Sequence, residues 1–174
     1  MTDDTRIVLT GFMGVGKSTV AKHLASILGC ERVDLDSVII EREHRTIAEI
    51  VENVGIGEFR RIESEVLADV IGGSAKIIAL GGGAWTIESN RDLIRSGRIT
   101  SIWLETSFER CWLNIVNSRR VRPLARNKAE TKKLFDERQR LYCLADWHYI
   151  IRADLTSYDV ARQIAEEVFS FTTN

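Results

Sequence analysis

The sequence predicts a three-layer α/β fold in which a parallel β-sheet is covered by helices on both faces. Two observations carry this prediction. Short apolar runs that are typical of buried strands alternate with amphipathic helical segments along the chain. The first apolar run is followed directly by a glycine-rich loop and a helix, which is the order of a nucleotide-binding unit. Because 174 residues suit one domain, we expect residues 1–174 to form a single unit.

The glycine-rich loop, residues 11–19, matches the Walker A pattern G-x-x-x-x-G-K-[ST] at every fixed position. A strand over residues 6–10 precedes it, and the helix that follows is expected to end at Gly29. The loop amides and the helix N-terminus suit the phosphates of a nucleoside triphosphate. Lys17 supplies a mobile charge for the outer phosphates, and the Ser18 hydroxyl can ligate Mg²⁺. The predicted nucleotide-binding residues are Gly14, Val15, Gly16, Lys17, Ser18 and Thr19.

Two carboxylates, Asp34 and Asp36, end the second predicted strand, residues 31–36. Alternate residues of an extended backbone share a face, so we expect the two side chains to converge. Ligands of open parallel sheets lie beyond the carboxyl ends of the strands, here beside the phosphate loop. The alternative is that Asp36 only caps the helix that begins at Ser37. Capping and function are compatible, and the neighbouring phosphate loop favours function.

Two helices are expected next. Thr46 begins the first with a capping box, and Gly55 and Gly57 separate it from the second. Arg60 and Arg61 then stand at the N-terminal end of the second helix, where the helix dipole disfavours cations. Two cations in that place indicate an anionic ligand, although a solvated helix face is the simpler alternative.

A run of three glycines follows the third predicted strand, residues 76–80. Gly81, Gly82 and Gly83 expose backbone at the carboxyl end of that strand and admit a ligand without side-chain obstruction, unless they form only a flexible turn. The remaining predicted elements are a helix over residues 90–96, a strand over 100–104, helices over 108–115 and 131–145, a strand over 149–151 and a final helix capped by Ser157.

A cluster of arginines, Arg119, Arg120 and Arg122, precedes the only proline of the chain. Such a cluster suits a mobile lid that closes over phosphates and stabilises the charge that develops during transfer. A nucleic-acid patch is the alternative, but no aromatic stacking pattern or wider basic surface accompanies the cluster.

The overall composition excludes several classes of protein. A formal net charge of -1 argues against a protein that mainly binds nucleic acid or anionic membranes. Apolar runs are too short for a membrane span and no basic, apolar leader is visible, so we expect a cytoplasmic protein. The cysteines and histidines are scattered without metal-ligand spacing, which predicts free thiols and no zinc site. We expect a monomer that binds small molecules only.

With these elements in place, the chain resembles the shikimate kinase family nearly from end to end. Six motifs carry the resemblance, and they occur in the family's order. They are the phosphate loop at residues 11–19, the pair Asp34 and Asp36, Phe59-Arg60, the triglycine turn, Arg122-Pro123, and the R-x-x-L-Y run at residues 138–142. Each motif is weak alone, whereas all six in order are specific.

The resemblance implies the P-loop fold of nucleoside monophosphate kinases, with a five-stranded parallel sheet of order 2-3-1-4-5. It also implies ATP-dependent phosphorylation of the 3-hydroxyl of shikimate to shikimate 3-phosphate, a step of aromatic amino acid biosynthesis. Helices over about residues 37–72 would bind shikimate, and residues 118–130 would form a lid.

The resemblance further implies a role for each site residue. The catalytic residues would be Lys17, Asp36 and Arg122, and Arg122 would also contact the nucleotide. The shikimate-binding residues would be Asp36, Arg60, Gly81, Gly82, Gly83 and Arg138. Of these, Arg60 and Arg138 would bind the carboxylate, which matches the planar fork of arginine. Ser18 would ligate Mg²⁺ and Asp34 would hold a magnesium-bound water.

The sequence departs from the family at positions that bear on nucleotide preference and substrate shape. Asn114 stands where many members carry an arginine that stacks on adenine, so Arg119 or Arg120 is expected to take that role. Trp85 is bulkier than the aliphatic residue usual after the triglycine turn.

Two other functions remain as alternatives. A related P-loop kinase would phosphorylate gluconate, a cyclitol or a nucleoside monophosphate. A cyclitol without a carboxylate would leave Arg60 and Arg138 unpaired, which is costly if they are buried. A catalytically silent binding module would be expected to lack Lys17, Asp36 or an arginine, and this sequence retains all of them.

Overall fold

A computed structural model describes residues 5–170 and contains a five-stranded parallel sheet of order β2-β3-β1-β4-β5. The strands are β1 (Ile7–Thr10), β2 (Arg32–Asp34), β3 (Ile77–Ala79), β4 (Thr100–Glu105) and β5 (Trp147–Ile150). The helices are α1 (Lys17–Leu28), α2 (Leu35–Glu43), α3 (Ile47–Gly72), α4 (Glu88–Ser96), α5 (Phe108–Val116), α6 (Lys128–Tyr142) and α7 (Ser157–Val168), with a 3-10 turn η1 (Ala84–Thr86). This topology confirms the predicted fold class and strand order.

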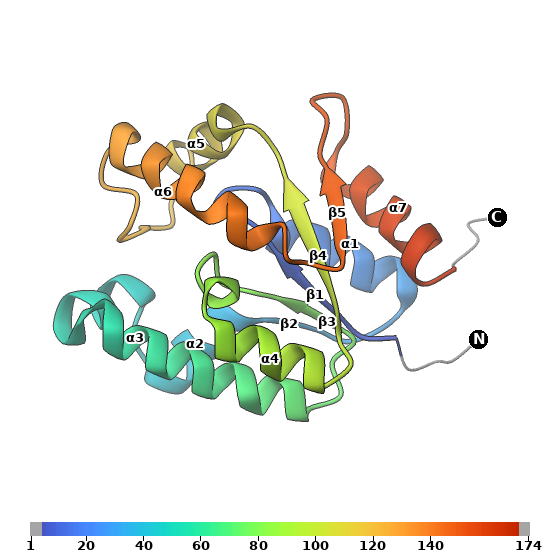
Figure 1. Cartoon of the computed structure of the whole chain (residues 1–174), viewed down its shortest axis with the longest axis horizontal. Coiled ribbons are helices and arrows are strands. Elements are labelled where there is room, and N and C mark those ends of the chain that lie inside the picture. Colours follow the sequence, from blue (N-terminus) through green and yellow to red (C-terminus); the bar gives the residue numbers. More distant parts are fainter. Residues whose placement is uncertain (1–4, 171–174) are drawn as a thin grey trace.

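The sheet lies between two layers of helices (Figure 1). Helix α1 packs against α7 on one side, and α3 and α4 pack together on the other. The central strand β1 pairs with β3 and β4, and all four of its residues are fully buried. A strand covered on both faces needs an apolar, β-branched sequence, which explains why Ile-Val-Leu-Thr occurs there.

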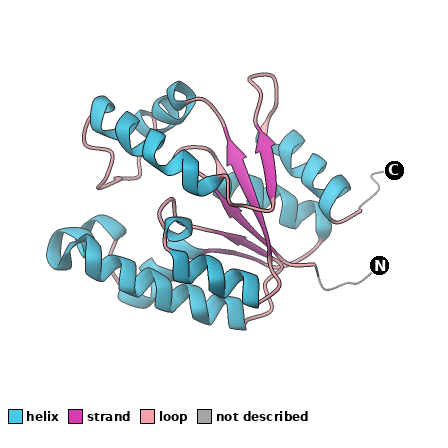
Figure 2. Cartoon of the chain, in the orientation of Figure 1, coloured by secondary structure: helices cyan, strands magenta, loops and turns pink. Residues whose placement is uncertain are grey.

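All strands point the same way, so their carboxyl ends meet at one edge of the sheet (Figure 2). The glycine loop leaves β1 at that edge, Asp34 ends β2, and Gly81 follows β3 after one residue. In open α/β sheets this edge is where ligands bind. The topology therefore brings together segments that are far apart in the sequence.

The second strand is shorter than predicted. It ends at Asp34, and Asp36 lies in the first turn of α2. Asp34 is the N-cap, because its Oδ1 accepts a hydrogen bond of 3.2 Å from the amide of Ser37. The interpretation of Asp34 and Asp36 as alternate residues of one strand was wrong, as was the alternative that Asp36 is the cap.

The two helices predicted around residue 55 form one element, α3, which bends at Gly55. Gly55 has φ 84° and ψ 166°, a conformation outside the helical region, whereas Gly57 is helical. The capping box at Thr46 is confirmed. Gly55 therefore separates two helical segments, as predicted, and Arg60 and Arg61 lie within the first two turns of the second segment, near its N-terminal end.

The remaining boundaries differ by a few residues. Helix α6 begins at Lys128, so the last residues of the predicted lid form its first turn. Thr156 caps α7, where Ser157 was predicted. Within residues 5–170 no helix is both long and apolar enough to cross a membrane.

We predict that replacing Arg6 with Ala lowers the free energy of unfolding by about 2 kcal/mol. The Arg6 guanidinium donates hydrogen bonds to the carbonyls of Val70 (3.3 Å), Ile71 (2.8 Å) and Ala75 (3.0 Å), at and just beyond the carboxyl end of α3. Urea denaturation would measure the loss. Arg162→Ala is the control, since it removes an exposed helix pair worth less than about 0.5 kcal/mol. Equal losses for both variants would contradict the prediction.

Candidate active site

The glycine loop is held in a backbone conformation that only glycine adopts easily. Gly11, Gly14 and Gly16 have φ values of 135°, 83° and 103°. A Cβ on Gly11 would lie 2.4 Å from the carbonyl oxygen of Leu104, and one on Gly14 would lie 2.6 Å from that of Cys111. The loop therefore packs against β4 and α5 too closely for any side chain at these two positions.

The N-terminus of α1 lies at the end of the loop, and the first amides of a helix have no partner within the helix, although that of Thr19 donates to the carbonyl of Gly16 at 3.0 Å. Gly16 is the N-cap and provides no side chain to accept from the first turn. A concavity lined by unpaired amides at the positive end of a helix dipole suits a phosphate group. This geometry is the one that the Walker A pattern predicts.

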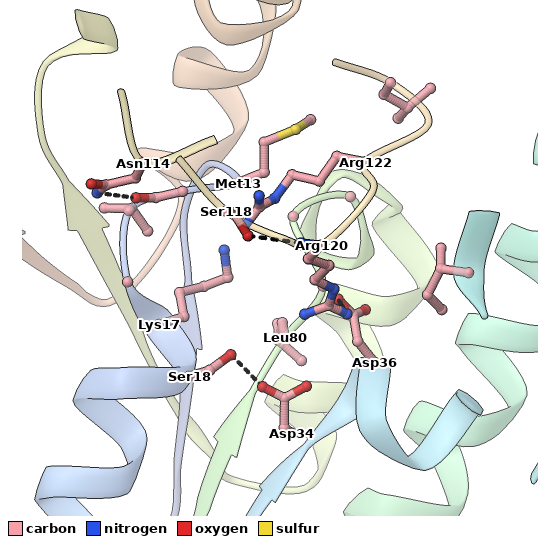
Figure 3. Close-up of a pocket in the computed structure, with 18 of the residues that line it drawn as sticks. Met13, Lys17, Ser18, Asp34, Asp36, Leu80, Asn114, Ser118, Arg120 and Arg122 are labelled. Atoms are coloured by element: carbon pink, nitrogen blue, oxygen red, sulfur yellow. Dashed lines mark hydrogen bonds and ion pairs between the residues drawn. The ribbon is translucent and has the colours of Figure 1, made fainter. Parts of the chain in front are cut away.

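Lys17 lies inside the loop with 8% of its surface exposed. Its Nζ donates to the carbonyls of Gly11 (2.8 Å) and Phe12 (3.1 Å). Burial lowers the pKa of Lys17 to about 8, and the nearby charge of Asp36 opposes that shift. The ammonium is thus held at the mouth of the phosphate loop, opposite Asp36 (Figure 3).

The phosphate loop forms one wall of a cleft of about 550 Å³, a size usual for small-molecule sites. The other walls come from α2 and α3, the triglycine turn, α6 and the segment between α5 and α6. The predicted site residues that line it are Gly14, Val15, Gly16, Lys17, Ser18, Thr19, Asp34, Asp36, Arg60, Gly81, Gly82, Gly83, Arg122 and Arg138. One cleft therefore contains all the residues assigned to phosphate, Mg²⁺, shikimate or catalysis, whereas Arg119 of the arginine cluster does not line it.

Ser18 and Asp34 meet at the floor of the cleft, where the Ser18 hydroxyl donates a hydrogen bond to Asp34 Oδ2 (Figure 3). A hydroxyl and a carboxylate are oxygen ligands of the type that Mg²⁺ prefers. Among the described residues no group of three or more His, Cys, Asp or Glu side chains is placed to hold a metal. The Ser18 and Asp34 pair fits Mg²⁺ that is bound mainly by phosphate and water, as is usual for that ion.

Asp36 projects from the first turn of α2 into the cleft and contacts an arginine of the opposite wall. Its Oδ2 accepts a hydrogen bond of 2.6 Å from Nη2 of Arg120 (Figure 3). Burial raises the pKa of Asp36, and the charge of Arg120 is the largest opposing effect. The sequence did not predict this pair, since it offered Arg120 as part of a lid over the phosphates or as an adenine contact.

The triglycine turn is packed against charged side chains. A Cβ on Gly81 would lie 2.6 Å from Glu63 Oε1 and 2.7 Å from Asp36 Oδ1, and one on Gly83 would lie 2.1 Å from Arg60 Nη2. Two of the three glycines therefore make room for the side chains of the site itself. All three glycines line the cleft as well, so the turn presents backbone to it.

Glu63 is a buried residue of this site that the sequence analysis missed as a functional group. Its side chain is 1% exposed and forms an ion pair with Arg60, while its Oε1 has no hydrogen-bond partner. Burial raises the pKa of Glu63, against the charge of Arg60. A signal was available, because Glu63 interrupts the buried apolar stripe of α3 next to Ile62 and Val66.

Arg138 and Tyr142 of α6 both donate to the carbonyl of Gly82, at 3.0 Å and 2.5 Å. Trp85 is fully buried behind the turn, and its Nε1 donates to the carbonyl of Leu141 at 2.8 Å. The turn and α6 are thereby locked together, and the Arg138 guanidinium is fixed at the cleft wall. The large side chain of Trp85 serves this packing.

The segment between α5 and α6 carries Arg120 and Arg122 over the cleft. Nη1 of Arg122 is buried without a hydrogen-bond partner. At the other end of the phosphate loop, Asn114 donates a hydrogen bond of 2.8 Å to the carbonyl of Gly14 (Figure 3). Arg120 points toward Asp36, and Arg119 is exposed and does not belong to the lining of the cleft.

Comparison with known proteins identifies the family to which this architecture belongs. A family model described as shikimate kinase matches residues 13–169. The chain belongs to the shikimate kinase family. A shikimate kinase from Geobacter sulfurreducens is 38% identical over 166 residues, which cover 94% of this chain and 90% of the relative.

Solved structures agree with the assignment to the shikimate kinase family. A shikimate kinase from Acinetobacter baumannii in complex with shikimate superposes with a TM-score of 0.87 at 31% identity, covering 97% of this chain and 94% of that one. A gluconokinase from Sinorhizobium meliloti has a TM-score of 0.61 at 14% identity, covering 96% and 97% of the two chains, which shows the shared fold alone. The family predicted from the six motifs is confirmed.

Proposed function

We propose that this chain transfers the γ-phosphoryl group of ATP to the 3-hydroxyl of shikimate. One observation carries the proposal: the phosphate loop with Lys17 faces a carboxylate, Asp36, and two arginines, Arg60 and Arg138, across a single cleft. Membership of the shikimate kinase family and the likeness to a shikimate complex support the identity of the acceptor.

The donor half binds the triphosphate. The amides at the start of α1 and the Lys17 ammonium would contact the outer phosphate oxygens, and the neighbouring side chains of Ser18 and Asp34 would hold Mg²⁺. Bound Mg²⁺ supplies positive charge that neutralises the β- and γ-phosphate oxygens. Lys17 and Arg122 add charge where the transition state spreads it.

The acceptor half orients shikimate. Arg138 is 8% exposed and held by Gly82, and Arg60 is held by Glu63, so both guanidinium groups are fixed before the ligand arrives. A ring carboxylate placed between them would accept paired hydrogen bonds. Since Glu63 already neutralises Arg60, the argument against an acceptor without a carboxylate rests mainly on Arg138.

Asp36 directs the nucleophile. Its carboxylate accepts the proton of the 3-hydroxyl while the oxygen forms a bond to the γ-phosphorus and the bond from that phosphorus to ADP breaks. Asp36 faces Lys17 across the cleft, which supports an approach of the hydroxyl in line with the leaving group. The segment over residues 118–130 would close as a lid and exclude water.

The test measures ADP release from ATP and Mg²⁺ with shikimate, gluconate, a carboxylate-free cyclitol, nucleoside monophosphates or no acceptor. We expect strong acceleration by shikimate alone and phosphate on its 3-hydroxyl by NMR. Faster turnover of another acceptor would make the chain a related P-loop kinase. If the chain bound ATP but no acceptor accelerated ADP release, the chain would be a catalytically silent binding module.

We further propose that the enzyme acts as a monomer in the cytoplasm. A single chain already brings the phosphate loop, Asp36, Arg60 and Arg138 into one cleft, so the site needs no residue from a second copy. The described cysteines, Cys30, Cys111 and Cys143, are free thiols, as is usual in a reducing compartment. Analytical ultracentrifugation at the enzyme concentration of the assay would test whether the enzyme is a monomer. An activity that rises steeply with enzyme concentration would contradict it.

We predict that replacing Gly83 with Ala raises the KM for shikimate about 10-fold, the effect of about 1.4 kcal/mol. The new Cβ would occupy the place of the Arg60 guanidinium, 2.1 Å from its Nη2, and the flexible Arg60 side chain would have to leave. Initial rates at varied shikimate measure the effect. Gly57→Ala is the control, because a Cβ there meets nothing within 4 Å. An unchanged KM in Gly83→Ala would show that Arg60 does not contact the acceptor.

A further inference from the structure

Arg120, whose guanidinium is permanently charged, forms an ion pair with Asp36. Asp36 is the carboxylate that the proposed function assigns as acceptor of the hydroxyl proton. Nη2 of Arg120 lies 2.6 Å from Asp36 Oδ2. Asp36 Oδ1 lies on the other side, close to Gly81. Arg120 therefore occupies Oδ2, and an acceptor hydroxyl that binds this oxygen meets the Arg120 guanidinium there.

Arg120 and Arg122 present their side chains to the same cleft. Both line it, and Val121 between them is 71% exposed. Val121 lines the cleft as well, so the whole of residues 120–122 borders it. The side chain of Arg120 is 41% exposed, so it can move without disturbing the core.

We propose that Arg120 is a further catalytic residue. In the substrate-free protein its guanidinium is paired with Asp36. Once the acceptor hydroxyl displaces the guanidinium from Asp36, Arg120 contacts the phosphoryl group that is being transferred. The proposal rests on the proposed function, since it requires Asp36 to bind the acceptor hydroxyl. Arg120 keeps its proton throughout and supplies charge only.

Distance favours this movement. An acceptor oxygen within about 3 Å of Asp36 has the phosphorus about 3 Å beyond it in a reactive complex. The phosphorus therefore lies about 6 Å from the Asp36 oxygen, and a guanidinium nitrogen that contacts the same oxygen starts at most about 9 Å from the phosphorus, a distance that rotation of the arginine side chain can span. The backbone amide of Arg120 donates to Ser118 Oγ at 3.1 Å, which steadies the segment that carries it.

The charges in the cleft also favour movement of Arg120 from Asp36 to the phosphoryl group. The other carboxylates of the cleft are engaged, because Glu63 pairs with Arg60 and Asp34 accepts from Ser18. The displaced guanidinium would meet the cations Lys17 and Arg122 unless it binds an anion. The γ-phosphoryl group is the anion nearest to it, and its charge spreads over three oxygens during transfer.

The test compares Arg120→Gln and Arg120→Lys with Arg126→Gln, which removes the same charge from an exposed position of the same segment. In the ligand-free protein we expect Arg120→Gln, like Asp36→Asn, to speed amide exchange over residues 118–124 several-fold. We expect Arg126→Gln to leave it unchanged.

Turnover is measured with whichever acceptor the wild type uses fastest. We expect kcat to fall about 10- to 100-fold in Arg120→Gln, with the acceptor KM unchanged or lower, and to recover partly in Arg120→Lys. An unchanged rate of amide exchange in Arg120→Gln would show that the pair between Arg120 and Asp36 does not hold the segment in the substrate-free protein. Faster exchange with an unchanged or higher kcat would show that Arg120 only blocks the site. Either result overturns the proposal. A preference for another acceptor would overturn the proposed function instead, and the Arg120 comparison would still be decisive.

Discussion

Replacing Asp36 with Asn is expected to lower kcat for shikimate phosphorylation by about 10²- to 10⁴-fold, the usual contribution of a general base. Asparagine has nearly the same shape, but its amide cannot accept the hydroxyl proton. The phosphate loop does not depend on Asp36, because the Lys17 ammonium is held by the carbonyls of Gly11 and Phe12. We therefore expect the Kd for ATP to change less than about 3-fold, as measured by calorimetry.

The matched control for Asp36→Asn is Glu41→Gln, which removes a carboxylate from an exposed position of the same helix, α2. It should keep wild-type kcat. Retention of full activity by Asp36→Asn would remove Asp36 from the mechanism. A large loss of ATP affinity would instead indicate that Asp36 organises the donor half of the cleft.

The second large effect is expected from Arg60→Lys, which should raise the KM for shikimate about 10- to 100-fold, a change worth about 1.4 to 2.8 kcal/mol. Lysine can keep the ion pair with the buried carboxylate of Glu63, so the fold should persist. It cannot offer the two parallel N–H groups with which a guanidinium binds a carboxylate. Steady-state rates at varied shikimate and at varied ATP separate the two substrates, and the KM for ATP should stay constant.

Arg61→Lys is a close control, because it makes the same change one residue along α3. Arg61 points to solvent and pairs with Glu58 and Glu65, at side chains that are about half exposed. Exposed pairs of this kind contribute little. If both variants weakened shikimate binding equally, a general loss of positive charge would explain the effect and the specific role of Arg60 would be wrong.

Features that depend on neighbouring residues could be predicted from the sequence. The glycine loop needs positive φ values and a helix start within nine residues, and the Walker A pattern encodes both. The alternation of apolar and amphipathic runs was sufficient for the parallel sheet, and the capping box at Thr46 was visible as a pair three residues apart. Hydrogen bonds and periodicity within one element are local, so sequence alone specifies them.

Contacts between segments that are distant in the chain could not be predicted from the sequence. Asp36 and Arg120 are separated by 84 positions, and nothing local to either residue indicates the other. Arg60 and Arg61 are chemically identical neighbours, yet a rotation of about 100° along the helix turns one to the cleft and the other to solvent.

The fold class, the phosphate loop and the strand order implied by the family resemblance could all be predicted from the sequence, and the residues assigned to the site all line one cleft. Only the tertiary structure decided that Glu63 is buried beside Arg60, that the space at Gly81 and Gly83 belongs to side chains of the site, and that Arg120 rests on Asp36. The physical reason is that a carboxylate or a guanidinium has the same local preferences in solvent and in a cleft. Its role depends on which distant group the packing of the sheet and helices places within hydrogen-bond distance.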